Sequence, residues 1–502
     1  MSVREGIRNR RDILYPLLLC LLFFIISFVR SPYSPLYHYT CNTDEVCYQL
    51  LSKGLLRGYM PYRDLFDHKG PLTYFVYALG LLIFGGNRVG SFFICTVLNL
   101  LTFVFLYKSA RLMFSDKISF FGSVIFVFMG SFMPDGFICT TTKPENFLLA
   151  PLMVSFYLFV REARVKDGEK FKGFSIKHMF ITGLMCGCVF MIKFNVCFFY
   201  LSFIGLYFIW TLIRKEFKIF FKSCGAFLSG IALICLPIFV FYGVKGALKD
   251  LFDVYFAFNL FYAGGAVNPF YLLKRSLTAS PKLSSTVFIL MGIVYLASLI
   301  GQKKMRLQTA VNFGISFLVF IVLTWPLVYS HFFVVFMPLC ILPCCFVAEI
   351  IGGRVKRLDA VTYVLMGLTL LFVLLNAVFR APATVRIRAD QEGVIGYAKT
   401  HPDSSAIYAG IEYRPFFIDY LDGIPDMRMF YLPPTYKEDM LIEMAQGIAD
   451  HKTDVVFLMD SESPDDRAME DLILRCGYER YTSYETDGVT IGMYVLPDEA
   501  LG

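Results

Sequence analysis

Apolar residues occupy most of the first 380 positions in long runs, and short polar segments separate these runs. Runs of roughly 17–25 residues recur between Ile13 and Phe379, and a helix of that length crosses the ~30 Å hydrocarbon core of a bilayer. The pattern predicts an all-α bundle that spans a membrane many times. The first run is followed by a polar loop and lacks a small-x-small cleavage site, so we read it as a span and not as a cleaved signal.

Basic clusters orient this predicted bundle, because Lys and Arg favour the cytoplasmic ends of membrane helices. The clusters are Arg4/Arg8/Arg10/Arg11, Lys108/Arg111/Lys117, Arg161/Arg164/Lys166/Lys170/Lys172, Arg214/Lys215/Lys218/Lys222, Lys303/Lys304/Arg306 and Arg354/Lys356/Arg357. When all of them are placed inside, the N-terminus is cytoplasmic, the C-terminus is outside, and there are eleven spans. These lie near residues 13–30, 90–107, 118–134, 147–160, 178–193, 195–213, 224–243, 284–301, 309–328, 332–350 and 360–379.

One apolar segment, residues 71–84, does not fit this arrangement as a span. It has about 14 residues, which is short for a crossing, and counting it would place every later basic cluster outside. We predict an interfacial or re-entrant helix on the outer face, with a short true span as the alternative.

Three large segments then fall on the outer face: residues 31–89, 244–283 and 381–502. We expect the functional site to lie on that side of the membrane. Segment 244–283 mixes aromatic residues with Lys and Arg, a composition that suits the lipid headgroup layer. Two interpretations of it remain open, a cover over a lipid substrate and a structural interfacial helix.

Composition separates the tail from the rest of the chain. From residue 386 onward we count 10 basic and 23 acidic residues, a net charge of −13, whereas the preceding residues carry 37 and 17, a net of +20. The basic part is the apolar part, with 57% hydrophobic residues overall and a mean hydropathy of +0.59 for the chain. Its charge therefore indicates topology and lipid contact, and not nucleic-acid binding.

Strands and helices alternate along the tail. Helices are predicted at residues 391–400, 437–451 and 465–476, and strands at 405–411, 454–459 and 488–496. We predict two domains, a membrane module of residues 1–384 and an extracytoplasmic α/β domain of residues 385–502. Four acidic residues after the second strand read as a solvated turn; they are Asp460, Glu462, Asp465 and Asp466.

Cysteines and metal-ligand patterns give little information about the function of the chain. Most of the 14 cysteines lie in or beside apolar runs and read as core residues. Cys41 and Cys47 flank an acidic pair in the outer loop; a bridge between them requires a non-helical stretch, and the sequence leaves it open. No spacing suggests zinc, so no cofactor is predicted, and a divalent metal is not indicated.

The first outer loop carries the densest polar chemistry. Asp44 and Glu45 open its first predicted helix, where carboxylates also serve as helix-dipole partners. Tyr62-Arg63-Asp64 and Asp67-His68-Lys69 add both charge signs within eight residues. Cationic groups can position a phosphate while a carboxylate accepts a proton. From these residues alone, an enzyme site and an ordinary surface loop stay equally open.

This loop resembles the first outer loop of the GT-C glycosyltransferases, and is most similar to the bacterial family 39 branch of protein O-mannosyltransferases and the lipid A aminoarabinose transferase. The matching features are an acidic pair soon after span one, a Gly-x-x-Pro-Tyr-x-Asp segment at residues 58–64, Lys69-Gly70-Pro71, and Phe84-Gly85 with Arg88. Gly70 departs from the pattern, since the family often has Pro there.

Weaker matches continue downstream, and the resemblance covers residues 12–350 in layout, together with the tail as an external α/β domain. Glu145 lies in a short outer loop where the family commonly has an acid. Lys193 ends the fifth span, as a Lys often does in the family, and His331 belongs to a stretch like the family's late His-Tyr segment with a following Pro.

The resemblance implies transfer of a sugar from a polyprenyl-phosphate carrier to a hydroxyl of a lipid, glycan or protein acceptor, with inversion, outside the cytoplasmic membrane of a bacterium. Asp44 is then the expected base, and Glu45 orients it or the acceptor. The expected donor-phosphate and substrate-binding residues are Arg63, Asp64, Asp67, His68, Lys69, Glu145, Lys193 and His331. Three of these have ordinary alternatives: snorkelling for Lys193, helix-dipole pairing for Glu145 and an interfacial position for His331.

Two rival functions remain. Multispan chains with intramembrane charges are often transporters or flippases, although no internal repeat is seen here and the long loops fall on one side. An O-antigen polymerase or ligase is the other, and it would place its main functional loop late in the chain.

Overall fold

The computed structural model describes residues 3–31, 33–37, 43–86, 89–132, 142–163, 173–262, 337–385, 392–411, 421–486 and 489–497. The predicted spans near 284–301 and 309–328, and also Cys41 and His331, lie outside these ranges. The chain packs as two compact units, one of residues 1–31, 93–238 and 267–378, and the other of residues 32–92, 239–266 and 379–502.

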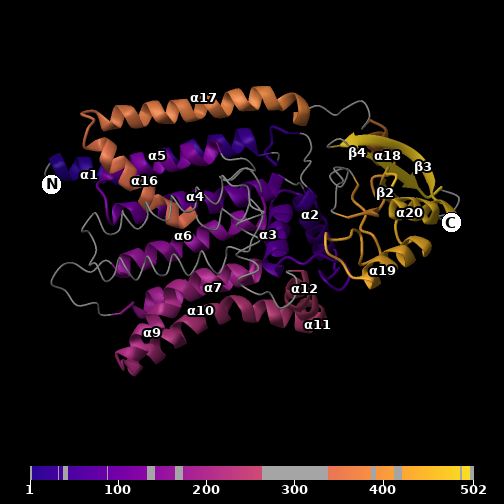
Figure 1. Ribbon diagram of the computed structural model, residues 1–502, viewed down its shortest axis with the longest axis horizontal. Coiled ribbons are helices and arrows are strands. Elements are labelled where there is room, and N and C mark those ends of the chain that lie inside the picture. The colour runs from indigo at the N-terminus through magenta and orange to yellow at the C-terminus, as the bar shows by residue number, and fades with distance from the viewer. Residues whose placement is uncertain are drawn as a thin grey trace. The chain divides into compact units, whose positions relative to one another are not determined.

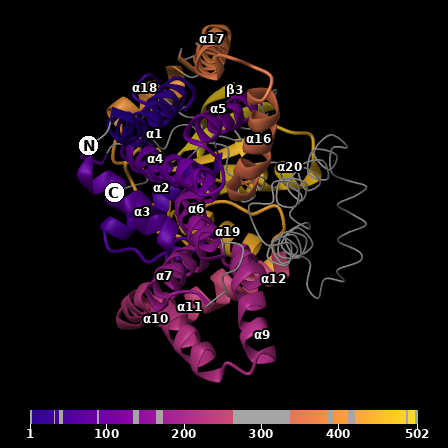
Figure 2. The same ribbon diagram turned by 90° about the vertical axis from the view of Figure 1, so that its left-hand side faces the viewer.

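Helices form the first unit, and Figures 1 and 2 show them along and across the bundle. They are α1 (Val3–Arg30), α4 (Val89–Arg111), α5 (Asp116–Phe132), α6 (Pro144–Ala163), α7 (Ile176–Ile192), a run of η1 (Phe194–Cys197), α8 (Phe198–Tyr200), η2 (Leu201–Gly205) and α9 (Leu206–Ile213), then α10 (Phe217–Val244), α16 (Met337–Gly352) and α17 (Leu358–Val385). Within the described residues, five helical segments are long and apolar enough to cross a membrane: 11–30, 89–111, 194–213, 217–244 and 358–378. The predicted membrane bundle is confirmed, while the number of spans stays a prediction.

Ion pairs tie several helix ends together at one end of the bundle. Arg111, in the last turn of α4, contacts Asp12 of α1 at 2.7 Å and also pairs with Asp116 at the start of α5. Lys117 pairs with Asp359 at the start of α17. The basic clusters beside these helices therefore lie on a common side, as the charge argument requires.

The same contacts bear on the apolar segment that follows α1. Arg111, at the C-terminal end of α4, contacts Asp12 near the N-terminal end of α1, so α1 and α4 run antiparallel. Arg30, at the C-terminal end of α1, donates to the Ser131 carbonyl at the C-terminal end of α5 at 2.7 Å. The chain between α1 and α4 thus makes no net crossing. It contains α3 (Pro71–Ile83), whose 13 residues span only about 20 Å as a helix. These observations agree with the predicted non-spanning helix.

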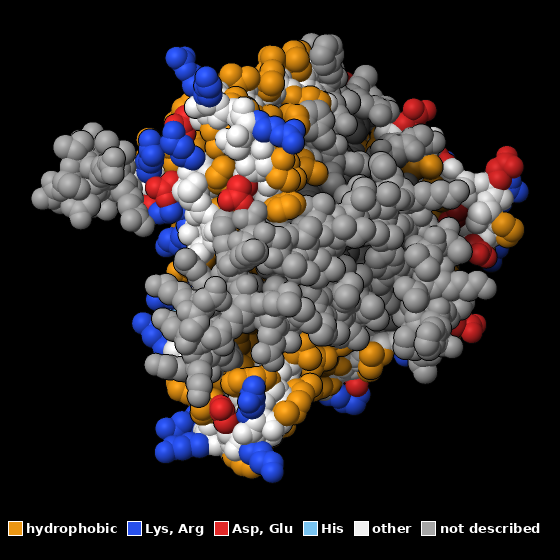
Figure 3. All heavy atoms as spheres, turned by 60° about the vertical axis from the view of Figure 1, so that its left-hand side comes forward, with side chains coloured by type: hydrophobic (Ala, Val, Ile, Leu, Met, Phe, Trp, Pro, Cys, Tyr) orange, Lys and Arg blue, Asp and Glu red, His pale blue; other side chains and the backbone are white. Residues whose placement is uncertain are grey.

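Small residues let two helices approach closely. A Cβ on Gly183 of α7 would lie 2.0 Å from the Phe227 carbonyl oxygen of α10, and one on Gly230 would lie 2.2 Å from that of Phe180. Such contacts are typical of helix pairs in membranes. Figure 3 shows apolar side chains gathered on the surface beside groups of Lys and Arg, and on α10 Leu228, Leu233 and Val240 are more than half exposed. These faces suit lipid contact.

The second unit combines the first loop with the tail. The loop holds α2 (Thr43–Leu56) and α3, and a short helical stretch follows α10, made of α11 (Leu248–Leu251), η3 (Phe252–Phe258) and α12 (Asn259–Tyr262). The tail holds α18 (Glu392–Thr400), β1 (Ala406–Tyr408), α19 (Glu438–Ala449), β2 (Val455–Met459), α20 (Pro464–Arg475), β3 (Glu479–Thr486) and β4 (Val489–Val495).

The four strands form one sheet in the order β1-β2-β4-β3, with β1 and β2 parallel and the other pairs antiparallel. Buried residues of β2 and β4 build its core, among them Val456, Phe457 and Met493. The predicted α/β tail is confirmed, with every predicted helix and strand in place. Strand β3 was not predicted, because it is an edge strand whose exposed Arg480 and Tyr481 leave no run of apolar residues.

Candidate functional site

The acidic pair opens helix α2. Asp44 and Glu45 lie in its first turn, where carboxylates stabilise the helix dipole. Asp44 is half-buried and Glu45 is fully buried. One turn later, burial and then the Asp67 carboxylate raise the pKa of the Cys47 thiol well above its usual value, while Lys69 lowers it. Groups from both ends of the loop therefore meet around Cys47. A bridge between Cys47 and Cys41, which the sequence leaves open, is not tested, since Cys41 lies outside the described residues.

Residues 58–64 form a tight turn held by its own polar groups. Tyr62 is fully buried with a φ of +77°, a backbone region rare for a bulky residue. Its hydroxyl donates to the Lys69 carbonyl at 2.6 Å. Asp64 accepts from the Met60 amide at 2.6 Å and from two nitrogens of Arg63 at 2.8 and 2.9 Å. The Gly-x-x-Pro-Tyr-x-Asp segment thus sets the course of the loop.

These bonds also set the charge state of Asp64. Partial burial pushes its pKa up, but the hydrogen bonds from Arg63 and from the Met60 amide outweigh burial, so the pKa lies below its usual 3.8. Arg63 makes a further bond to the Lys245 carbonyl at 2.8 Å. Both residues are therefore charged and held in place at neutral pH.

A buried carboxylate fastens the loop to the tail. Asp67 is 1% exposed and accepts hydrogen bonds from the hydroxyls of Tyr74 (2.8 Å) and Tyr431 (3.0 Å) and from the amide of His68 (2.8 Å). Tyr431 stands 364 positions away in sequence, beyond the reach of any local pattern. We call this set, Asp67 with Tyr74 and Tyr431, the tyrosine clasp.

His68 and Lys69 follow the clasp directly. The Lys69 ammonium lies 3.1 Å from His68 Nε2 and 5.8 Å from the centre of the Tyr48 ring. An ammonium only donates, so Nε2 is the acceptor and His68 is assigned as the neutral tautomer with its proton on Nδ1, 3.5 Å from Asp67. The Lys69 backbone is fixed as well, because its carbonyl accepts from Tyr62 and, at 3.2 Å, from Tyr74.

The next residue explains the departure from the family pattern. Gly70 has a φ of −68° and a ψ of 147° and precedes Pro71 at the first position of α3. That φ is the value a proline ring imposes. The backbone of this turn is therefore the one that the family's proline would adopt.

Glu145 and Lys193 form an ion pair inside the first unit. Glu145 lies in the first turn of α6 and is 2% exposed, and the Lys193 ammonium donates to its Oε1. Lys193 adopts extended backbone, φ −158° and ψ 91°, between α7 and η1. Lys193 is thus paired and does not snorkel alone, and removing either partner would leave a buried charge.

The structure therefore groups the candidate residues into three sets: Arg63 with Asp64, Asp67 with His68 and Lys69, and Glu145 with Lys193. His331 lies outside the described residues. Sequence reasoning missed Tyr74 and Tyr431, and also Asn259, whose amide donates to the His68 carbonyl at 2.6 Å. Aromatic residues in segment 244–283 and in FYLPPTY of the tail were the available signal. Within the described ranges, no group of three or more His, Cys, Asp or Glu residues could hold a metal ion.

Comparison with known proteins gives both a family match and a fold match. Residues 68–242 match the family model of dolichyl-phosphate-mannose-protein mannosyltransferases. No curated protein matches the chain by sequence. The crystal structure of ArnT from Cupriavidus metallidurans bound to undecaprenyl phosphate shares the fold, with a TM-score of 0.61, 11% identity and 98% of both chains covered.

A second structure with a similar fold comes from an archaeon. The oligosaccharyltransferase AglB from Archaeoglobus fulgidus, in complex with an inhibitory peptide and a dolichol-phosphate, matches with a TM-score of 0.52 and 12% identity, over 98% of this chain and 75% of that one. At these identities the structures show the fold, and the match over residues 68–242 adds the family resemblance. The family match covers residues 68–242 and the shared fold covers almost the whole chain, so the chain resembles the membrane glycosyltransferases of the GT-C superfamily, as the first loop indicates.

Proposed function

We propose that this protein transfers a sugar from a polyprenyl-phosphate carrier to a hydroxyl group of an acceptor, on the outer face of a bacterial cytoplasmic membrane. The observation that carries the proposal is the shared fold with ArnT, a protein seen bound to undecaprenyl phosphate, over 98% of both chains. The family match to dolichyl-phosphate-mannose-protein mannosyltransferases points to the same kind of donor.

The reaction needs a base and a group that receives the departing phosphate. In the proposed step the acceptor oxygen attacks the anomeric carbon, the bond from that carbon to the phosphate oxygen breaks, and the configuration inverts. A carboxylate takes the hydroxyl proton, and cations stabilise the charge that grows on the leaving lipid phosphate.

Asp44 is our candidate for the base. It is half-buried, so it is partly open to a ligand, whereas its neighbour Glu45 is fully buried and better placed to orient the loop. Asp67 is less suited to proton transfer, because both of its carboxylate oxygens already accept hydrogen bonds in the tyrosine clasp. Asp64 is likewise engaged with Arg63.

Lys69 is our candidate for the donor phosphate. It is half-buried, its backbone carbonyl accepts hydrogen bonds from Tyr62 and Tyr74, and the neutral His68 beside it adds no competing positive charge. Lys193 and His331 remain further candidates. The Lys193 ammonium would bind a phosphate only if it donated to the phosphate and to Glu145 at the same time.

Purified protein in detergent, incubated with a panel of radiolabelled polyprenyl-phosphate sugars, tests the proposal. We expect one labelled donor to be consumed in the presence of a membrane extract that supplies acceptors, and Asp44→Asn to lower that consumption by roughly 10²-fold or more. Asp403→Asn, at an exposed position of the tail, is the control. If no donor is consumed while labelled lipid crosses a vesicle membrane, the flippase alternative replaces the proposal.

A further inference from the structure

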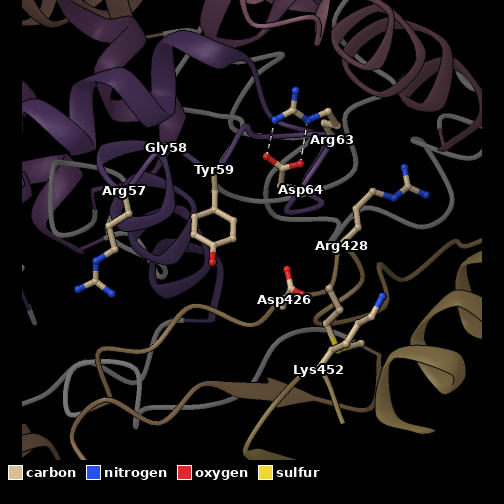
Figure 4. Close-up of a pocket in the computed structure, with 9 residues that line it drawn as sticks. Arg57, Gly58, Tyr59, Arg63, Asp64, Asp426, Arg428 and Lys452 are labelled. Atoms are coloured by element: carbon tan, nitrogen blue, oxygen red, sulfur yellow. Dashed lines mark hydrogen bonds and ion pairs between the residues drawn. The ribbon is translucent and has the colours of Figure 1, made fainter. Parts of the chain in front are cut away.

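A cavity of about 500 Å³ opens within the second unit, between the first loop and the tail. Its loop wall carries Tyr59, Arg63 and Asp64, and its tail wall carries Asp426, Arg428 and Lys452 (Figure 4). We call this cavity the loop pocket. Its volume lies in the range of small-ligand sites.

The lining of the loop pocket excludes an apolar ligand. Met427 is the one aliphatic or thioether side chain among its described lining residues, whereas four cations, counting Arg57, and two carboxylates surround it. Lipid tails and polyprenyl chains need apolar walls. A ligand rich in hydroxyl groups fits better, because carboxylates accept from hydroxyls, while guanidinium and ammonium groups donate to them.

Several of these groups are available to a ligand. In the part of the chain that the structure describes, Tyr59, Asp426 and Lys452 make no side-chain hydrogen bond or ion pair, and Figure 4 shows Tyr59 and Asp426 directed into the space between the walls. Arg63 and Arg428 are anchored on Asp64 and Glu443 and keep unused N–H donors. The guanidinium groups are thus already oriented before a ligand arrives, which lowers the entropy cost of binding.

Lys452 indicates which kind of hydroxyl-rich ligand the loop pocket binds. Three of the four lining cations are paired with carboxylates, Arg57 with Asp422, Arg63 with Asp64 and Arg428 with Glu443. Lys452 is exposed without a carboxylate partner among the described residues, so its ammonium can bind an acidic group of a ligand. We infer that the loop pocket binds an acidic saccharide, one that carries a carboxylate or phosphate group beside its hydroxyls. Naming this saccharide as part of the acceptor rests on the proposed function, whereas the binding itself does not.

Isothermal titration of the full-length protein in detergent, without any donor, tests the inference. We expect trigalacturonate to bind at least about tenfold more tightly than the neutral maltotriose, and its affinity to fall as salt is added. A phosphorylated trisaccharide that binds still more tightly also supports the inference and assigns the acidic group to phosphate. Equal affinity for the acidic and the neutral trisaccharide, or no binding of either, overturns it.

Variants locate the binding. Lys452→Gln should remove most of the preference for the acidic trisaccharide, while Lys399→Gln, an exposed lysine on α18 outside the pocket, should retain it. Tyr59→Phe should weaken both trisaccharides by loss of one hydroxyl. Retained preference in Lys452→Gln with an unchanged melting temperature places the acidic saccharide elsewhere and overturns the assignment. Because no donor is present, failure here leaves donor consumption, and with it the proposed function, untouched.

Discussion

Individual residues of the first loop divide into those that hold the loop and those that are partly open to a ligand. Asp64 and Asp67 have their oxygens occupied by Arg63, Met60, Tyr74 and Tyr431. Asp44 and Lys69 are half-buried on elements that these contacts fix. This division favours Asp44 and Lys69 over Asp64 and Asp67 as residues that contact a substrate, a distinction that the sequence alone did not make.

The base is tested by a substitution that keeps its size. Asp44→Asn removes proton acceptance, so we expect donor turnover to fall by roughly 10²-fold or more. Expression should be unchanged and the melting temperature should fall only slightly, because the substitution removes one favourable charge from the start of α2 at a half-buried position. Turnover is followed by release of labelled sugar from the carrier. Near-wild-type turnover would transfer the role to Glu45 or Glu145.

Lys69 is tested by separating charge from geometry. Lys69→Ala should raise the Michaelis constant for the donor more than that for the acceptor. Lys69→Arg should keep part of the activity, because the guanidinium group keeps the positive charge but differs in geometry from the ammonium group. Michaelis constants for donor and acceptor, each measured at saturating partner, distinguish the two effects. An equal loss for both substrates in Lys69→Ala would indicate a misfolded loop and remove the phosphate role.

Segments far apart in sequence hold each other within the second unit. Residues 421–432 of the tail contact the first loop through Tyr431 on Asp67, through the Arg428 carbonyl, which accepts from the Phe66 amide at 2.8 Å, and through Asp422. Lys53 reaches Asp422 at 3.0 Å, and Arg57 pairs with the same carboxylate. Loop and tail therefore support each other's conformation.

The tyrosine clasp should contribute measurably to stability. Tyr431→Phe removes one hydrogen bond to a buried carboxylate, so we expect the free energy of unfolding to fall by about 1.5–3 kcal/mol. The apparent melting temperature in detergent should decrease accordingly. Tyr481→Phe serves as control, since Tyr481 is an exposed tyrosine on β3. Equal melting temperatures for the two variants would contradict a structural role for the clasp.

The Asp422 contacts predict a pH dependence. Partial burial raises the pKa of Asp422, but Lys53 and Arg57 outweigh burial and hold it below its usual 3.8. A lowered pKa stabilises the folded state above about pH 4, and the stabilisation is lost as the pH falls through the folded value. Because the pair is exposed, the effect should be no more than about 1 kcal/mol.

Thermal melting of Asp422→Asn over a pH series measures this contribution. The variant should melt below wild type near neutral pH, and the two curves should converge in acid below the folded pKa, where the wild-type carboxyl is also neutral. A difference that persists unchanged in acid would assign the effect to packing and not to charge.

Across the whole molecule, the bundle places one group of basic clusters at a common end, where Arg111 and Lys117 bind Asp12, Asp116 and Asp359. The positive-inside rule predicts that this end is cytoplasmic. The C-terminal α/β domain, and with it the loop pocket, is then expected outside.

A fusion tests this orientation directly. A reporter that is active only in the cytoplasm, attached after Gly502, should be silent, whereas one that is active only outside should give signal. The same pair of reporters attached before Met1 should give the opposite result. An active cytoplasmic reporter at the C-terminus would reverse the orientation and the proposed side of catalysis.

The sequence by itself determined the membrane bundle, the α/β tail and the first loop as the place of interest. These follow from hydrophobic run length, from strand and helix periodicity and from a local motif, all of which are short-range signals. Strand β3 escaped this reading because an edge strand with exposed polar residues has no such period.

Only the tertiary structure decided what each polar residue does. Asp44, Asp64 and Asp67 are alike in sequence, and they differ in their surroundings: Asp67 is buried and accepts from Tyr431, Asp64 pairs with Arg63, and Asp44 is half-buried. The pairing of Glu145 with Lys193 and the loop pocket, with walls from opposite ends of the chain, likewise depend on long-range packing. Neighbours in space set the charge state of a side chain and its access to a ligand. The sequence pattern does not predict these neighbours, because the fold brings them together from positions hundreds of residues apart.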